Sequence, residues 1–268
     1  MAGAVFDVQN VRYCYDRVVA LDGAMLKVAP GLRLALLGAN GSGKSTLLRL
    51  LDGIYFAESG TVRFEGEALT EARFEEDAFA FDFRRRVAML FQNPDVQLFN
   101  PSVFDEVAFG PLQLRWSAGE IRSRVEAILE QLHIAHLKDR PPHRLSGGEK
   151  KRVAIASVLI LDPQVLLLDE PTATLDPESQ SQIIEIIAGW KDSGRTVITA
   201  THDLDVLEEI ADRCVVFQAG RVVAEATPPA ILADEELLRR TGLLHCHGHR
   251  HASGEIHSHP HRHWNHET

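Results

Sequence analysis

The chain has 268 residues, 45% of them hydrophobic and 25% charged, which is the balance of a globular protein long enough for one large α/β domain or two small ones. Lys and Arg total 28 against 38 Asp and Glu, so the formal net charge is −10 and we expect no nucleic-acid partner. The three cysteines form no CxxC pair, and the longest nearly apolar run, residues 153–161, is too short to span a bilayer. Together these features predict a cytoplasmic protein.

Strand and helix patterns alternate along the chain. Short strands are predicted at 4–13 and 24–37, with turns at Asp22-Gly23 and Pro30-Gly31, and further strands at 61–64 and 87–91. Residues 71–86 (EARFEEDAFAFDFRRR) are predicted to form a solvated surface insertion. The remaining chain predicts a mostly helical section at 102–161, buried strands at 165–168 and 196–200, and helices at 178–189 and 204–211. This alternation indicates a parallel sheet flanked by helices.

Histidine is concentrated at the C-terminus. Nine of the 13 histidines lie between His245 and His266, within the last 26 residues. Regular periodicity stops at Gly242, so we expect one folded domain over residues 1–242 and a disordered tail over residues 243–268. The two Arg and two acidic residues of this tail cancel, and the net charge of −10 therefore belongs to the folded domain.

A glycine-rich segment, Gly38-Ala-Asn-Gly-Ser-Gly-Lys44-Ser45, lies between a predicted strand and a predicted helix. It satisfies the GxxxxGK[ST] pattern, in which glycines let the backbone wrap phosphates and N–H groups at the helix start supply positive charge. Lys44 is suited to reach the β- and γ-phosphates, and the Ser45 hydroxyl is suited to bind Mg²⁺. An ordinary glycine turn does not account for the full motif in this context. We expect nucleotide to bind at Gly38, Ala39, Asn40, Gly41, Ser42, Gly43, Lys44, Ser45 and Thr46.

Two acidic residues follow the apolar run that begins at Val165. Asp169 ends this predicted strand at the edge where ligands bind in open α/β sheets, and Glu170 comes next. Asp169 is predicted to hold Mg²⁺ through its water shell, and Glu170 to orient or deprotonate a water that attacks the γ-phosphate. A turn cap is the alternative for the pair alone, but beside a phosphate loop the pattern favours ATP hydrolysis.

The segment Leu145-Ser-Gly-Gly-Glu-Lys-Lys-Arg152 closely resembles the signature sequence of ABC-type ATPases. Ser-Gly-Gly at a helix start offers a hydroxyl and free N–H groups, which suit a further phosphate. The resemblance implies an α/β fold: a P-loop NTPase core of ABC ATPase type, with an antiparallel β subdomain and a helical subdomain, roughly residues 95–162, that carries the signature.

The same resemblance implies a head-to-tail dimer, either a homodimer or a pair with a related ATPase. Each ATP would then lie between the phosphate loop of one subunit and the signature residues of the other, which are Ser146, Gly147, Gly148 and Glu149. Glu149 stands where glutamine is most usual in the family, a difference that leaves the Ser-Gly-Gly donors intact.

Other positions match the ABC family in order. Tyr15 resembles the aromatic residue on which adenine stacks, although Tyr13 is an alternative and a Tyr packed in a strand is another. Gln92 matches the glutamine that senses the γ-phosphate and Mg²⁺, and Asp176 ends the loop that contacts the other subunit. His202 matches the switch histidine at the γ-phosphate. The resemblance thus implies ATP with Mg²⁺ and the catalytic residues Lys44, Gln92, Glu170 and His202, with Mg²⁺ held by Ser45, Gln92 and Asp169.

The segment after Gln92 is more discriminating within the family. Its Asp-Val-Gln-Leu-Phe sequence resembles that of the ATPases of energy-coupling-factor (ECF) importers, in which this piece forms a short helix facing the membrane partner. Val96, Leu98 and Phe99 would then form an exposed apolar patch for integral-membrane transporter subunits, with internal packing as the alternative. This resemblance implies a location on the cytoplasmic face of the cell membrane.

The C-terminal tail points to a cargo. Histidines at a spacing of two are ligands suited to Ni²⁺, Co²⁺, Cu²⁺ and Zn²⁺, and cobalt and nickel systems are a known branch of ECF importers. The candidate ligands are His245, His247, His249, His251, His257, His259, His261 and His263. A neutral solvated tail is the alternative.

Four other functions remain open from the sequence. They are an importer of a vitamin, a soluble ABC ATPase of iron–sulfur cluster assembly, a mechanical or translation-associated ABC protein, and a metal-storage protein whose ATPase is secondary. The Asp-Val-Gln-Leu-Phe segment favours an importer over an assembly ATPase.

Overall fold

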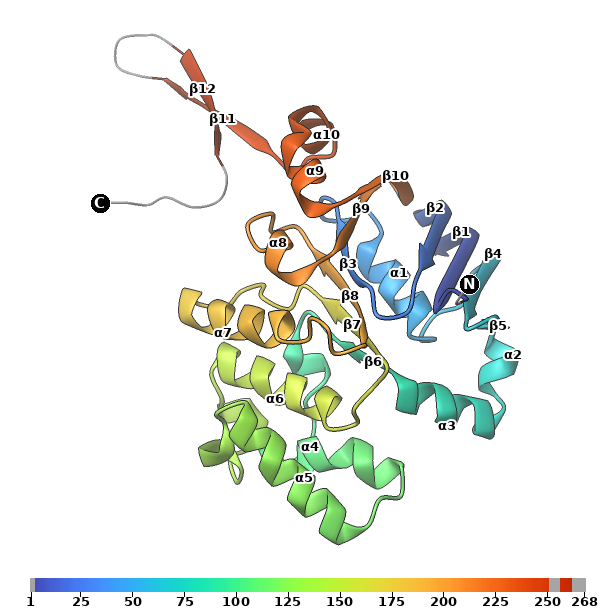
Figure 1. Ribbon diagram of the computed structural model, residues 1–268, viewed down its shortest axis with the longest axis vertical. Coiled ribbons are helices and arrows are strands. Elements are labelled where there is room, and N and C mark those ends of the chain that lie inside the picture. The colour runs from blue at the N-terminus through green and yellow to red at the C-terminus, as the bar shows by residue number, and fades with distance from the viewer. Residues whose placement is uncertain (1–2, 251–255, 262–268) are drawn as a thin grey trace.

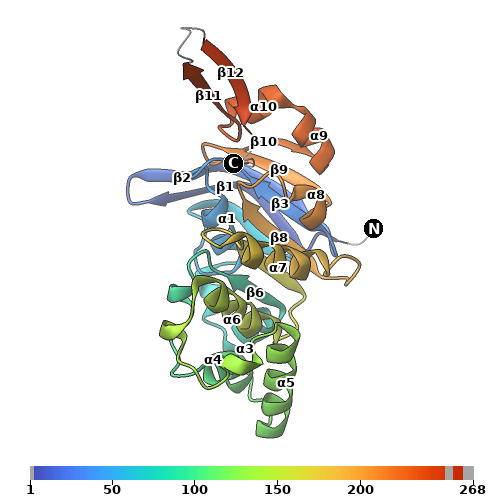
Figure 2. The ribbon, with the colours of Figure 1, turned by 90° about the vertical axis from the view of Figure 1, so that its left-hand side faces the viewer.

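Two main β-sheets, a C-terminal two-stranded hairpin and a group of helices make up the part of the chain that the structure describes (Figures 1 and 2). The computed structural model describes residues 3–250 and 256–261, and it describes side chains for residues 3–244. An antiparallel sheet near the N-terminus has the order β2-β1-β4-β5. Its strands are β1 (Phe6–Tyr15), β2 (Val18–Val28), β4 (Ser59–Phe64) and β5 (Glu67–Ala68).

The larger sheet has six strands in the order β10-β9-β3-β8-β7-β6. All neighbours are parallel except β10, which pairs antiparallel with β9 at the edge. Because the parallel strands end at one edge, the loops after β3, β7 and β8 meet there. The strands are β3 (Arg33–Leu37), β6 (Val87–Leu90), β7 (Val165–Asp169), β8 (Thr196–Thr201), β9 (Arg213–Gln218) and β10 (Arg221–Ala226).

The helices fall into groups around these sheets (Figure 1). The helices α2 (Glu71–Phe74) and α3 (Asp77–Arg86) lie next to the antiparallel sheet. A helical unit is formed by α4 (Val103–Gln113), α5 (Ala118–Gln131) and α6 (Gly147–Leu159), which pack together. The 3₁₀ turn η1 (Pro94–Val96) precedes α4, and η2 (Ala135–Leu137) and η3 (Pro142–Arg144) lie between α5 and α6. The remaining helices are α1 (Lys44–Leu51), α7 (Pro177–Ala188), α8 (Leu207–Ile210), α9 (Pro228–Ala233) and α10 (Glu235–Arg240).

Apolar side chains cover both faces of the six-stranded sheet, as a sheet with helices on either side requires. Along β3, Leu34 and Leu36 belong to the core shared with α1 and the antiparallel sheet. The alternate residues Ala35 and Leu37 belong to a second core, shared with α4–α7. The sheet is thus fixed between two cores, and its loop edge is left for the polar site. The expected parallel sheet and antiparallel subdomain are both confirmed.

The turn expected at Asp22-Gly23 is wrong. These residues lie inside β2, where Gly23 adopts φ 80° and is left over between the pairs Val11–Ala24 and Arg12–Asp22. It forms a β-bulge, for which glycine in this conformation is suited. The chain reverses earlier, where Asp16 takes a φ of 51° between β1 and β2.

The expectation of a solvated insertion over residues 71–86 is wrong for its aromatic residues. Phe83 is buried, and Phe74 and Phe79 pack against the same core. Phe79 and Phe83 lie four residues apart, so they share one face of α3. Only Phe81 is an exposed phenylalanine here, and the charged residues lie on the outer side. The segment is therefore an amphipathic cover for the antiparallel sheet.

The C-terminus also differs from expectation. Leu243 and Leu244 pack against the core, so the packed body reaches two residues beyond the expected boundary at 242. A two-stranded antiparallel hairpin follows, β11 (His245–Arg250) and β12 (Ile256–His261), where we expected disorder (Figure 1). The alternation of His with other residues has the period of a strand, which accounts for the hairpin. His251 and His263 lie outside the described residues.

Candidate active site

The phosphate loop joins β3 to α1, as predicted. Its glycines are required by space: a Cβ on Gly38 would lie 2.5 Å from the Phe217 carbonyl oxygen, and one on Gly43 would lie 2.6 Å from that of Ala20. Both residues also have positive φ, at 148° and 110°. The Ser42 hydroxyl is buried in this loop and has no hydrogen-bond partner among the residues whose side chains the structure describes. An orphaned donor in a loop of backbone N–H groups fits the phosphates of a nucleotide.

Lys44 extends across this loop. Its Nζ donates to the carbonyl oxygens of Gly38, at 2.7 Å, and Ala39, at 3.3 Å, and lies 3.9 Å from Glu170 Oε1. Burial lowers the pKa of Lys44, while the carboxylates of Glu170 and Asp169 oppose that shift. The ammonium thus lies among oxygen atoms that it can exchange for phosphate oxygens.

A pair of oxygen ligands for Mg²⁺ is already assembled. The Ser45 hydroxyl donates to Asp169 Oδ1 at 2.8 Å, which joins the start of α1 to the end of β7. Burial raises the pKa of Asp169, and the Ser45 hydrogen bond and nearby cations oppose this shift. Hydroxyl and carboxylate oxygens are the hard ligands that Mg²⁺ prefers, so these residues fit that ion.

Glu170 and His202 form the polar centre of the site. His202 Nδ1 lies 3.0 Å from each carboxylate oxygen of Glu170 and donates to it. The Glu170 backbone has φ 46°, a strained conformation for this residue type, and its N–H donates to the Ala200 carbonyl oxygen at 2.9 Å. Glu170 is buried whereas His202 is exposed. The carboxylate is therefore held rigidly, and the imidazole faces outward.

Predicted residues from four parts of the chain line one hollow of about 430 Å³, whereas the predicted Gly38, Ala39, Asp169 and His202 are not among its lining residues. Tyr15 lines it and Tyr13 does not; Tyr13 instead stacks on Tyr55, with ring centroids 5.2 Å apart. The geometry therefore favours Tyr15 as the adenine platform. The hollow is lined by Tyr15, Val18, Val19, Ala20, Asn40, Gly41, Ser42, Gly43, Lys44, Ser45, Thr46, Gln92 and Glu170.

The signature residues do not line that hollow. Ser146 caps α6, where its hydroxyl accepts from the Glu149 N–H at 3.3 Å and its own N–H donates to Glu149 Oε2 at 2.7 Å. This backbone hydrogen bond lowers the pKa of Glu149. Asp176 likewise caps α7 by accepting from the Ser179 N–H at 3.0 Å. Glu149 and Asp176 thus serve as helix caps within the chain, a role that the sequence analysis did not assign to them.

Two basic residues that the sequence analysis did not single out lie at this site. Arg49 Nη1 donates to the Tyr15 hydroxyl at 3.2 Å, and that hydroxyl lies 3.3 Å from Thr46 Oγ1. Lys151 Nζ donates to the carbonyl oxygens of Phe91 and Gln92. The sequence gives little indication of this role, because a lysine in a run of three basic residues is expected to face solvent. Burial in the fold is what distinguishes Lys151 from its neighbours.

An exposed apolar patch forms on the helical unit. Val96 and Phe99 are 68% and 67% exposed, as predicted, but Leu98 is partly buried against the core. The patch gains Phe109 and Leu112 from α4, and the Phe99 and Phe109 rings meet edge to face with centroids 5.0 Å apart. Phe109 and Leu112 follow Phe99 closely in sequence, but they were not singled out because their exposure on α4 is set by the packing of that helix.

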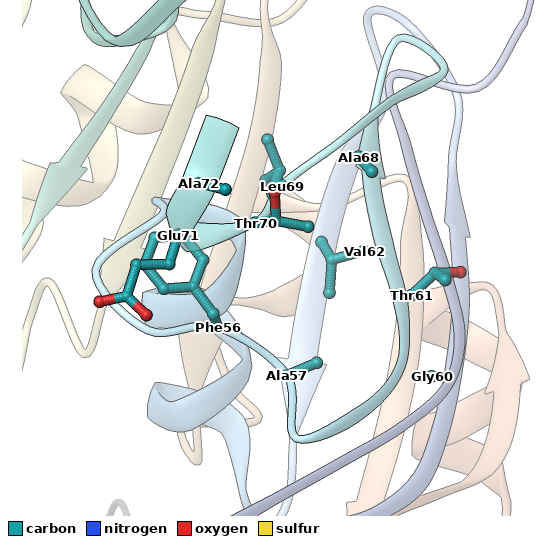
Figure 3. A pocket seen from close by; sticks show the side chains of 10 residues that line it. All are labelled: Phe56, Ala57, Gly60, Thr61, Val62, Ala68, Leu69, Thr70, Glu71 and Ala72. Carbon is teal, nitrogen blue, oxygen red and sulfur yellow. The ribbon is translucent and has the colours of Figure 1, made fainter. Parts of the chain in front are cut away.

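A second hollow, of about 440 Å³, lies on the antiparallel sheet (Figure 3). Figure 3 shows side chains around it from β4, the β5–α2 connection and the segment after α1, including Phe56, Val62, Leu69 and Glu71. None of its lining residues belongs to the phosphate loop, the acidic pair or the signature. The nucleotide chemistry therefore stays with the first hollow.

The fold and the site together define a P-loop ATPase, with a phosphate loop, an Mg²⁺ pair and a buried glutamate at the edge of a parallel sheet. The model of the ABC transporter family matches residues 21–173, and the chain belongs to that family. It is an ATP-hydrolysing subunit of a transporter. Within the part of the chain that the structure describes, no helix combines the length and apolar character needed to cross a bilayer.

Relatives and solved structures agree with this assignment. The chain is 56% identical over 242 residues to the nickel import ATP-binding protein NikO of Rhodobacter capsulatus, covering 89% of this chain and 95% of the relative. It is 46% identical over 226 residues to the cobalt import ATP-binding protein CbiO of the same organism, covering 84% and 79%. The structure of cbiO1 from Clostridium perfringens, part of the ABC transporter complex cbiONQ, matches with a TM-score of 0.75 and 39% identity over 90% of this chain and 95% of that one. A dimeric ATP-binding cassette bound to ADP and Pi matches with a TM-score of 0.74 and 26% identity over 83% and 98%.

Proposed function

We propose that this chain powers the import of nickel or cobalt ions through integral-membrane partner subunits, from the cytoplasmic face of the cell membrane. The similarity to NikO across nearly the whole of both chains supports nickel most strongly, and the similarity to CbiO supports the same class of cargo. The single observation that carries the ATPase part is the buried Glu170, held beside the phosphate loop and bonded to His202.

Each residue has a chemical task in this proposal. Lys44 and the N–H groups of the loop bind the phosphates of ATP, and Tyr15 stacks on the adenine. Ser45, Asp169 and Gln92 hold Mg²⁺, which neutralises phosphate charge when it is bound. Glu170 orients the attacking water and accepts its proton. His202 contacts the γ-phosphate, and its bond to Glu170 fixes the direction of that carboxylate.

The active form that we propose is a head-to-tail dimer. The hollow at Lys44 is open to solvent, and the signature residues Ser146 and Gly147 are exposed elsewhere on the chain. Two copies facing each other would place the free N–H groups at the start of α6 on the ATP of the other copy. The similarity to a dimeric cassette bound to ADP and Pi supports this arrangement.

The dimer is tested with the variant Glu170→Gln, which keeps the nucleotide site but removes the base. Its mass by light scattering should double when ATP and Mg²⁺ are added and should stay monomeric with ADP. A monomer at saturating ATP would contradict a homodimer. If the dimer then formed only with a second ATPase chain, the head-to-tail arrangement would stand with a different partner.

The exposed patch of Val96, Phe99, Phe109 and Leu112 is proposed as the contact for the membrane subunits. These four large apolar side chains are exposed, and two of them are in contact with each other, which suits an amphipathic helix of a partner. Phe99→Asp should release the chain from the membrane subunits in a pull-down while leaving its own ATP hydrolysis intact. The matched control is Phe81→Asp, which alters an exposed phenylalanine on α3, away from the patch.

The cargo is tested on the intact transporter, purified with its membrane subunits and placed in lipid vesicles. We expect ATP-dependent uptake of radioactive Ni²⁺ or Co²⁺, abolished by Lys44→Ala. Uptake of a vitamin with neither metal would replace the cargo and keep the ATPase. Purification solely with soluble scaffold proteins would instead favour iron–sulfur cluster assembly.

The histidine-rich tail is proposed to bind transition metal ions, in addition to the ATPase. The register of the hairpin supports this, because it places His245 opposite His261, His247 opposite His259 and His249 opposite His257. Imidazole nitrogens are ligands suited to Ni²⁺ and Co²⁺, and the pairing brings histidines from both strands into register.

A chain that ends at Leu244 tests the tail. Calorimetry should show Ni²⁺ binding to the full chain and its loss in the shorter chain, while ATP turnover stays within about twofold. The double variant His247→Ala/His259→Ala removes both histidines of one paired register, and it should weaken binding more than His247→Ala alone. Equal Ni²⁺ affinity for the shorter chain would exclude a metal site in the tail.

A further inference from the structure

The segment of residues 91–97, which contains Gln92, is attached to the signature helix α6 rather than held by β6 alone. Lys151 Nζ donates to the Gln92 carbonyl oxygen at 2.7 Å and to the Phe91 carbonyl oxygen at 3.2 Å. Lys151 lies one helical turn after Gly147 on the same helix. The backbone position of Gln92 is therefore linked to the helix whose first turn carries the signature.

Two further attachments join this segment to the same helix. The Gln97 side chain accepts from the Phe91 N–H at 3.2 Å and donates to the Ala154 carbonyl oxygen at 3.0 Å and to Ser157 Oγ at 3.1 Å. Lys150 Nζ pairs with Asp95 Oδ1 at 2.6 Å. Both the N–H and the C=O of Phe91 are thus bonded to groups on α6 or to a side chain held by α6.

The burial of Lys151 indicates that its hydrogen bonds to the 91–97 segment, and not its packing alone, account for a lysine at this position. Its side chain is 1% exposed, although lysine is rarely buried without partners. Burial lowers the pKa of Lys151 to about 8, while the negative charges of Asp169 and Glu170 oppose the shift. An apolar residue would fill the same space without this cost, but it would leave the two carbonyl oxygens without a donor.

We propose that Lys151 is a positioning residue that fixes Gln92 to the signature helix, so that the glutamine and the signature move as one body. A shift of α6, caused by ATP bound to the partner copy, would then move Gln92 relative to the γ-phosphate in its own site. This inference rests on the proposed roles of Gln92 and of the head-to-tail dimer. It gives the two ATP sites of a dimer a direct mechanical link through one lysine.

The test combines Lys151→Met, which keeps the aliphatic chain and removes the donors, with Gln92→Ala in the full-length chain. Lys151→Met should lower kcat about tenfold while the Kd for ATP changes less than about twofold, since a misplaced group costs turnover more than binding. In the Gln92→Ala background the same substitution should cost less than about twofold more, because the effect passes through Gln92. The control Lys138→Met, which breaks an exposed pair with Glu126 away from this segment, should leave kcat unchanged.

The outcomes separate this inference from the proposed function. Normal turnover in Gln92→Ala would remove the role assigned to Gln92. Two results would overturn the positioning role alone. The first is an impaired Gln92→Ala together with a normal Lys151→Met. The second is an equal loss of kcat from Lys151→Met in both backgrounds, which would mean that Lys151 acts through the charge of Asp169 and Glu170. If Lys151→Met fails to fold, Gln97→Met offers a second test, because it breaks the hydrogen bonds of Gln97 to Phe91 and α6. The loss of turnover caused by Gln97→Met should likewise vanish in the Gln92→Ala background.

Discussion

The phosphate-loop side of the active site and the signature turn are built in opposite ways. On the first side, Lys44, Asp169 and Glu170 are buried and bonded to one another or to the loop. On the second, Ser146 and Gly147 are exposed, and the side chains of Ser146 and Glu149 are hydrogen-bonded within their own helical turn. The phosphate side is therefore bonded internally within one chain, whereas the signature turn presents exposed groups that the proposed dimer would place against the other copy.

The largest expected effect contrasts one glutamate from each side. Glu170→Gln should lower ATP turnover about 10³-fold, because it removes the carboxylate that takes the proton of the attacking water. Glu149→Gln should change turnover less than about twofold, because glutamine also completes a capping box. Steady-state phosphate release measures both.

Two outcomes would break this contrast. Unchanged turnover in Glu170→Gln would remove Glu170 from its role as base. A large loss in Glu149→Gln, with an unchanged melting temperature, would mean that the charge of Glu149 acts on nucleotide and not only on the helix start.

The next effect distinguishes two adjacent glycines of the signature. A Cβ on Gly147 meets nothing within 4 Å, whereas one on Gly148 would lie 2.3 Å from Ser179 Oγ and 3.0 Å from Ser179 Cβ. Gly147→Ala should therefore leave the melting temperature unchanged and lower turnover about tenfold, by obstructing ATP on the partner copy. Gly148→Ala should lower the melting temperature as well, because the new methyl group presses on its own α7.

Thermal unfolding and phosphate release on the same samples check this pair. If Gly147→Ala kept full turnover, the space in front of the signature would not be filled by nucleotide, and the dimer proposal would lose its main support. If it destabilised the isolated chain, the turn would have a structural role within the chain itself.

The features predicted well from sequence are those whose residues act through local chemistry. The phosphate loop, the buried strand ending at Asp169 and the helix start at Ser146 follow from glycine spacing, an apolar run and the Ser-Gly-Gly sequence, and the structure has each in place. Gln92 and Glu170 line the same hollow, as the family resemblance implied.

The features that were missed depend on contacts between distant parts of the chain. The burial of Lys151 and the anchoring of Phe83 are decided by neighbours far away in sequence, Phe91 and Phe64. The family resemblance favours Tyr15 over Tyr13, and only the contact of Tyr13 with Tyr55 adds a structural reason. The bulge at Gly23 was missed for a related reason. Asp-Gly is compatible with both a turn and a β-bulge, and the pairing with β1 decides between them.

A smaller effect tests how the phosphate side recognises the base. Tyr15→Ala should raise the Kd for ATP about tenfold, which is the range expected from loss of one stacked base. Tyr13→Ala should leave the Kd nearly unchanged and lower stability, because Tyr13 packs on Tyr55. Fluorescent nucleotide titration measures both, and the reverse ranking would make Tyr13 the platform.

The smallest effect concerns stability and lies at the far end of the phosphate-loop helix. Asp52 ends α1, and burial raises its pKa from 3.8 to about 7, although Arg84 opposes the shift. The folded state then holds a proton that the unfolded state loses near pH 4. Stability therefore falls as the pH rises from about 4 to about 7, and it stays reduced above pH 7.

Asp52→Asn should remove the cost of the buried charge, giving about 1 kcal/mol of added stability at pH 8 after allowance for solvent screening, and less at pH 5. Urea unfolding at both pH values checks the prediction, with Glu75→Gln as an exposed control. An equal gain in the free energy of unfolding at both pH values would contradict this prediction. It would show that the asparagine amide stabilises the helix end through hydrogen bonds, and not through removal of the Asp52 charge.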